Sequence, residues 1–218
     1  MERTITVRGT GKLSVKPDLI NIDLTLSSKD MVYSKAMQGE DKQLSALREA
    51  LAPAGFTEDD LKTASFDVRT EYQSVRGKDG MYREEFAGYV CEHQLKLEFP
   101  LDGDKLSEVL SAVSRCTAEP RLFISFSVKD KSAASDKLLA STAKNAKSRA
   151  RLLAEAAGAE LGELVSITYD WRDLSFVSPT AYNRNMLKCA AEEDCGFGGI
   201  SPQDIDLSDS AVFVWELA

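Results

Sequence analysis

Hydrophobic and polar residues alternate along the first thirty residues of the chain. Residues 12–16 (KLSVK) have the period of a β-strand, and so do residues 20–27, in which isoleucine and leucine alternate with polar residues. The Pro17-Asp18 pair between these stretches predicts a turn. A kink is expected at residues 9–11 (GTG), after a first strand that begins near residue 5. The pattern therefore predicts three successive strands.

A glycine pair that follows an apolar stretch also raises the question of a phosphate-binding loop. Such a loop must open onto a helix N-terminus, whereas Gly11 is followed by strand alternation. Neither a full dinucleotide fingerprint nor a Lys-Ser/Thr pair is present. We interpret Gly9 and Gly11 as structural residues that permit a bulge or a tight bend at positive φ, and we expect no nucleotide binding.

Apolar residues at three- and four-residue spacing predict three helices. The first runs from a cap at Asp30 to about Leu51, and the second, shorter helix covers residues 104–115. The third covers residues 131–157, is rich in alanine and ends at Gly158. Its small side chains allow the helix to lie close to a sheet.

Further alternating stretches predict strands, and a strand–helix–strand–strand order occurs twice. These patterns predict an α+β fold in which an antiparallel sheet is packed by two long helices, with a duplicated strand–helix–strand–strand unit. We expect a single domain over residues 1–218. The further strands are expected at residues 62–73, 83–99, 121–129, 163–171 and 211–217.

A stretch without clear period at residues 172–210 interrupts this order and is predicted to be an insertion. We expect it to be either mobile or ordered by a partner or a second subunit. Its expected anchors are Tyr182, Met186, Leu187 and Phe197.

The composition limits the classes of partner. The 218 residues carry a net charge of -8, which argues against nucleic acid because phosphate neutralisation needs surplus cations. The sequence has no apolar run of the roughly 20 residues that a membrane span needs, so no membrane insertion is expected. The first residues show no apolar signal region, which predicts a cytoplasmic protein, or a periplasmic or exported one if a leader has been removed.

Few residues offer chemistry. His93 is the only histidine, and in a strand it shares a face with Cys91, but a metal site needs three or four ligands. We therefore expect a partly buried sheet histidine, no cofactor, no stoichiometric zinc and no hydrolase activity. Cys189 and Cys195 lack the spacing of common zinc or redox motifs, and we interpret them as loop thiols while keeping a redox role as an alternative.

The third helix also carries a basic outer face. An RNA or acidic-partner site there lacks interleaved aromatic residues, so a solvated face is the favoured interpretation. The face comprises Lys137, Lys144, Lys147, Arg149 and Arg151.

Several segments together resemble the SIMPL-domain family. They are residues 5–11 (ITVRGTG) with 15–18 (VKPD), residues 63–68 (TASFDV) with Tyr72, residues 88–90 (GYV), and residues 152–158 (LLAEAAG) with 161–164 (LGEL). The resemblance covers residues 5 to about 170. It implies an α+β domain, a tendency to form oligomers, and no established catalytic residues; many bacterial members are exported and stress-related, and an animal member is a kinase-binding adaptor.

The combined expectation is a non-enzymatic, oligomer-forming protein with an assembly, adaptor or stress-related role and a protein partner. The alternatives are a small-ligand or metal-binding module that uses the concave face of the sheet, or a thiol redox protein that uses Cys189 and Cys195. Open edges for assembly are expected at residues 4–8 and 211–217. Whether Phe213 and Trp215 face the core or a neighbouring subunit is left open by the pattern.

Overall fold

The computed structural model describes residues 3–76, 81–170, 173–183 and 201–218. The chain divides into two compact units, each of which is described by itself. Unit 1 comprises residues 1–18, 127–179 and 202–218, and unit 2 comprises residues 19–126 and 180–201. The expectation of a single domain stays a prediction.

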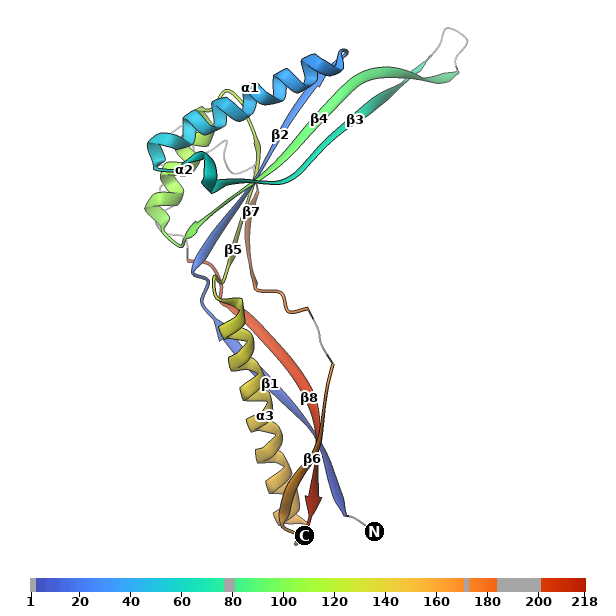
Figure 1. Cartoon of the computed structure of the whole chain (residues 1–218), viewed down its shortest axis with the longest axis vertical. Helices are drawn as coiled ribbons and strands as arrows, with labels where there is room; N and C mark the ends of the chain where they lie inside the picture. Colours follow the sequence, from blue (N-terminus) through green and yellow to red (C-terminus); the bar gives the residue numbers. More distant parts are fainter. Residues whose placement is uncertain (1–2, 77–80, 171–172, 184–200) are drawn as a thin grey trace. The chain divides into compact units, whose positions relative to one another are not determined.

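Unit 1 is a three-stranded sheet with one helix on one face (Figure 1). The strand order is β1-β8-β6, and both neighbouring pairs are antiparallel. Alternate residues of β1 and β8 point at the helix α3, whose buried stripe consists mostly of alanine. The elements are β1 (Thr4–Val15), α3 (Lys131–Ala156), β6 (Leu161–Tyr169) and β8 (Ile205–Leu217).

The two glycines of β1 allow α3 to approach the sheet. The expected kink and positive φ are wrong: β1 pairs with β8 without a break from Thr4 to Val15, and neither glycine has a positive φ. Instead, a Cβ on Gly9 would lie 2.4 Å from the carbonyl oxygen of Thr142. A Cβ on Gly11 would lie 2.6 Å from that of Leu138. The glycines are structural because there is no room for a side chain.

The C-terminal strand β8 lies in the middle of its sheet, so the expectation that it forms an open edge is wrong. Phe213 and Trp215 are both buried against unit 1's own core. Their rings stack with centroids 5.5 Å apart. Of the two strands that were expected at an edge, only β1 lies at one. The other edge of this sheet is β6.

Unit 2 contains a five-stranded sheet in the order β3-β4-β2-β5-β7. The helices α1 and α2 lie over one face of it (Figure 1), and their apolar stripes meet leucines and isoleucines of β2 and β4. The two central pairs, β2 with β4 and β4 with β3, are antiparallel. The elements are β2 (Leu19–Asp30), α1 (Tyr33–Leu51), β3 (Leu61–Arg76), β4 (Tyr82–Pro100), α2 (Gly103–Arg115), β5 (Arg121–Ser127) and β7 (Val177–Asn183).

The start of α1 differs from the sequence prediction. Asp30 is the last residue of β2 rather than a helix cap, and its carboxylate accepts a hydrogen bond from the backbone of Val32. The helix begins only at Tyr33. For α2 the cap is Asp102, whose side chain accepts from two backbone N–H groups.

The α+β class is confirmed, but the repeated strand–helix–strand–strand order is not a repeat in space. The strand β5 joins the sheet of unit 2, whereas α3 and β6 build unit 1. Within the proposed insertion, residues 177–183 form β7, and β8 begins at residue 205. Tyr182 packs against Phe126 in the core of unit 2. The other expected anchors, Met186, Leu187 and Phe197, lie outside the described residues.

Candidate functional site

An exposed row of aromatic side chains follows one face of the β3–β4 hairpin in unit 2. The hairpin continues past the N-terminal end of α1 (Figure 1), so this part of it is a two-stranded arm. The rings form a chain of edge-to-face contacts with centroids 5.2 to 5.9 Å apart. We call these four residues the aromatic row: Tyr33, Tyr89, Phe86 and Tyr72.

A β-bulge brings the row onto one face. Tyr72 pairs with Phe86 and Glu71 pairs with Gly88, so Ala87 is an extra residue in β4. In a regular strand, Phe86 and Tyr89 would point to opposite faces, because they are three residues apart and side chains alternate along a strand. Gly88 has φ +123, and a Cβ there would lie 2.8 Å from the carbonyl oxygen of Asp30. The row therefore depends on the bulge and on one glycine.

The aromatic row is open to solvent. Tyr72 is 57% exposed and Phe86 is 37% exposed. Met81 and Tyr82, on the same hairpin, are also exposed. Aromatic and methionine side chains in an exposed apolar patch are typical of protein–protein contacts.

An ion-pair cluster lies on the other face of the same sheet. Glu92 binds the guanidinium groups of Arg69, at 2.7 Å, and of Arg121. The hydrogen bond from Arg69, with the charge of Arg121, holds the pKa of Glu92 below its usual value. A cavity of about 470 Å³ beside this cluster is also lined by Lys29, which pairs with Glu71. Because these cations are already paired with carboxylates, the cavity offers an anionic ligand little free charge.

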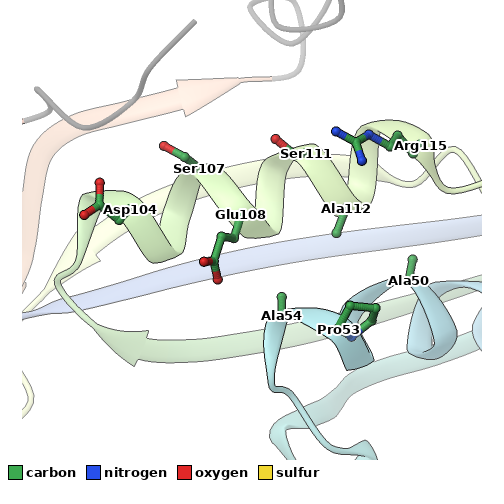
Figure 2. Close-up of a pocket in the computed structure, with 9 residues that line it drawn as sticks. All are labelled: Ala50, Pro53, Ala54, Asp104, Ser107, Glu108, Ser111, Ala112 and Arg115. Atoms are coloured by element: carbon green, nitrogen blue, oxygen red, sulfur yellow. The ribbon is translucent and has the colours of Figure 1, made fainter. Parts of the chain in front are cut away.

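A groove of about 740 Å³ separates the C-terminal end of α1 from α2. In Figure 2, Ala50, Pro53 and Ala54 face Glu108 and Ala112 across it. The small side chains leave the space open, and its volume is in the range of ligand pockets. The groove lies between helices, whereas the sequence hypothesis placed a small ligand on the sheet.

His93 lies in the core of unit 2, as expected for a sheet histidine, but with partners that the sequence did not indicate. Its Nδ1 is 2.5 Å from Oε1 of Glu40 in α1, and its Nε2 is 2.8 Å from Oγ1 of Thr63 in β3. His93 and Glu40 are buried, whereas Thr63 is exposed. Glu40 lies 53 residues from His93 in the sequence, and no local pattern marks it.

The cysteines in the described part of the chain are shielded from solvent. Cys91 and Cys116 are buried free thiols. Burial, reinforced by the charge of Glu40, raises the pKa of Cys91 above its usual value, which disfavours the thiolate. Cys189 and Cys195 lie outside the described residues, so their redox role stays a prediction.

The remaining sequence candidates do not converge on a site. Among the described residues, no three histidine, cysteine, aspartate or glutamate side chains gather as a metal site would require. The expectation of a zinc-free protein therefore stays a prediction. The cations of the α3 face are exposed, and Arg149 donates to the backbone oxygen of Arg8.

The chain belongs to the SIMPL family. Residues 5–215 match the family described as "SIMPL: Protein of unknown function (DUF541)", which is most of the chain. The resemblance inferred from residues 5–170 is thereby confirmed. The family description assigns no activity.

One curated relative is the "26 kDa periplasmic immunogenic protein" of Brucella abortus (strain S19). It is 25% identical over 168 residues, which are 75% of this chain and 65% of the relative. The chain thus matches about two thirds of the relative's length. Among solved structures, the regulatory subunit of aspartate kinase from Thermus flavus aligns over 97% of this chain and 89% of its own, at 11% identity. Its TM-score of 0.18 is too low to support a conclusion.

In the parts of the chain that the structure describes, no helix combines the length and apolar character needed to cross a bilayer.

Proposed function

We propose that this protein is a self-assembling member of the SIMPL family, and that the aromatic arm of one copy packs against the arm of a second copy. The observation that supports this proposal is the uncovered aromatic row. A two-stranded ribbon is only marginally stable in water by itself, and it gains stability when its apolar face is covered. Burial of the row against an identical row provides that cover in a two-fold, self-complementary contact.

The strand β3 supports the same contact. It lies at the edge of its sheet, is 16 residues long and contains no proline. Long edges of this kind present backbone donors and acceptors to a further strand unless they are blocked. A second copy supplies a strand of matching length and pattern. Since each copy carries a net charge of -8, the attraction must come from apolar burial and backbone pairing rather than from net charge.

The experiment compares molar mass by light scattering for the parent and for Phe86→Ser. Phe123→Ser is the matched control, because Phe123 is 42% exposed on β5, close to the 37% of Phe86. The parent and the control should exceed the monomer mass of 23.9 kDa, and Phe86→Ser should dissociate at least about 30-fold more readily, the effect of one interface hot spot. Far-UV circular dichroism checks that all three proteins fold.

Two outcomes contradict the proposal. One is a parent that stays monomeric at high concentration, and the other is a Phe86→Ser variant that keeps the mass of the control. Added salt separates this contact from an assembly held by surface ion pairs. Salt should leave the apolar contact intact, whereas it weakens interactions between exposed charges, above all those separated by more than the Debye length of about 10 Å at 0.1 M.

We also propose that the protein works in the periplasm. The Brucella abortus relative is named a periplasmic protein, which supports this compartment. No observation supports the cytoplasmic expectation. Cell fractionation with an antibody against the native protein tests the compartment, and recovery in the cytoplasmic fraction would reject it. The adaptor and stress-related roles stay predictions.

A further inference from the structure

A hydrogen-bonded chain runs from Glu40 through His93 to Thr63. Nδ1 of His93 is 2.5 Å from Oε1 of Glu40, and Nε2 is 2.8 Å from the hydroxyl of Thr63. In the tautomer whose Nδ1 carries the proton, the ring donates to Glu40, because a carboxylate oxygen can only accept. Nε2 of that tautomer has a lone pair and can accept the O–H of Thr63.

A second β-bulge aims Thr63 at the histidine. Thr63 pairs with Leu95 and Phe66 pairs with His93, and the register shifts between Thr63 and Ser65, so that Ala64 is an extra residue. Directly paired residues share a face of a sheet, so the bulge places both Thr63 and Phe66 on the side of His93. Bulges occur next to active sites, where they redirect a side chain in this way.

The three residues span the boundary between core and solvent. Glu40 is 2% and His93 is 6% exposed, so the base and its carboxylate are held away from water. Thr63 is an exposed residue of the edge strand β3, and the hydrogen bond between its hydroxyl and His93 is part-buried. The ring of Phe66, 44% exposed, lies edge-on to the imidazole at 5.1 Å and provides an apolar wall beside that hydroxyl. Cys91 shares this face but is fully buried and does not compete as a nucleophile.

We infer that Thr63 is a base-activated nucleophile that accepts acyl groups from carboxylic esters with good leaving groups. The observations behind this inference are separate from those behind the proposed assembly, although Thr63 lies on the same strand β3. A nucleophile within hydrogen-bond reach of a base, and a base oriented by a carboxylate, is the arrangement that activates hydroxyl groups in acyl transfer.

The step balances without a further reactant. Oγ1 of Thr63 attacks the ester carbonyl carbon while Nε2 of His93 takes the hydroxyl proton. The bond to the leaving alcohol then breaks, and His93 returns the proton to that oxygen, which leaves an ester on Thr63. Water can then hydrolyse this ester. His93 takes a proton from water, and the resulting hydroxide adds to the ester carbonyl. Oγ1 of Thr63 leaves as the proton returns to it from His93. Glu40 is a positioning residue that holds the imidazole ring through Nδ1.

The experiment incubates the full chain with p-nitrophenyl acetate and maps acetylated peptides by mass spectrometry. Thr70 is a matched control, because it is exposed on the same strand and is paired with Tyr89, away from His93. Trypsin separates the two sites into residues 63–69 and 70–76. Acetyl should accumulate on Thr63 and not on Thr70, and Thr63→Val should abolish it.

His93→Ala should slow acetylation of Thr63 by about 100-fold or more, the usual contribution of a general base. Added imidazole should restore part of the rate, which a merely structural histidine would not show. The inference is overturned if Thr63 is not acetylated, if it reacts no faster than Thr70, or if His93→Ala leaves its rate unchanged. If the His93→Ala protein does not fold, the inference is tested by the comparison of Thr63 with Thr70 and by the Thr63→Val variant.

Discussion

Replacing Gly9 or Gly11 by alanine should destabilise unit 1 through a clash with α3. A Cβ on Gly9 would lie 2.4 Å from the carbonyl oxygen of Thr142 and 2.7 Å from Cβ of Ala146. A Cβ on Gly11 would lie 2.3 Å from Oγ1 of Thr142, besides its contact with the carbonyl of Leu138. Most of these atoms belong to the helix backbone or its Cβ positions, so α3 itself has to move.

The expected cost follows from that movement. Overpacking a close-packed core typically costs about 1–3 kcal/mol, and we expect about 2 kcal/mol for each glycine. In the double variant one displacement of α3 relieves both clashes, so the combined loss should be smaller than the sum of the single losses. Urea unfolding followed by tryptophan fluorescence measures the effect, because Trp215 is buried in the core of unit 1.

Gly158 provides the control. It has φ +74, and a Cβ there would meet nothing within 4 Å, so only its backbone conformation resists substitution. At this position asparagine should be tolerated better than alanine, since asparagine adopts the left-handed conformation more readily. At Gly9 and Gly11 asparagine should be worse than alanine, because it is larger. Single variants within about 0.5 kcal/mol of the parent, the range of ordinary surface substitutions, would refute the packing argument.

Three further predictions concern titrating groups. Arg69 lowers the pKa of Glu92 in the folded protein, so the ionised side chain stabilises the fold at neutral pH, and this contribution is lost as the pH falls through the folded pKa. Glu92→Gln should therefore lower Tm at about pH 7, and the difference from the parent should shrink as the pH falls below the ordinary glutamate pKa of about 4.3. The hydrogen bond to Asp209 raises the pKa of Tyr169 in the folded protein. Because tyrosine in the unfolded chain then ionises first, the parent should lose stability above about pH 10. In a series of alkaline melting curves, Tyr169→Phe should show a smaller loss. Cys91 should react with iodoacetamide only after unfolding, as peptide mapping can show, and rapid alkylation in the native protein would contradict its burial.

The pattern of apolar and polar residues was enough to predict the class of fold and most of its elements. Spacing of three and four residues placed Leu47 and Leu51 on the buried face of α1, where the structure has them. Alternation located β2, β3 and β4 within a few residues of their ends. These features are local: burial of one face of a helix or strand imposes its period on the residues that form it.

The role of Gly9 and Gly11 and the position of β8 in its sheet follow only from the tertiary structure. In the sequence, Gly9 and Gly11 resemble a bend, but their reason lies in α3, more than 120 residues away. Likewise residues 211–217 resembled an open edge because they are apolar and contain no proline, but β8 lies in the middle of its sheet because β1 and β6 pair with its two sides. Pairing partners are set by contacts across the fold, which leave no periodic mark on the strand itself.

The two candidate sites show the same division. Both depend on a β-bulge, at Ala64 or Ala87, which brings side chains that are three residues apart onto one face of the strand. A one-residue shift in a period of two reverses every later position, yet alanine has no distinctive sequence signal for a bulge. The histidine could be read from the sequence, but Glu40 and Thr63 reach it only because α1 and β3 pack on either side of β4. Chemistry between residues so far apart in sequence is fixed by packing, and only the folded chain brings them within hydrogen-bond distance.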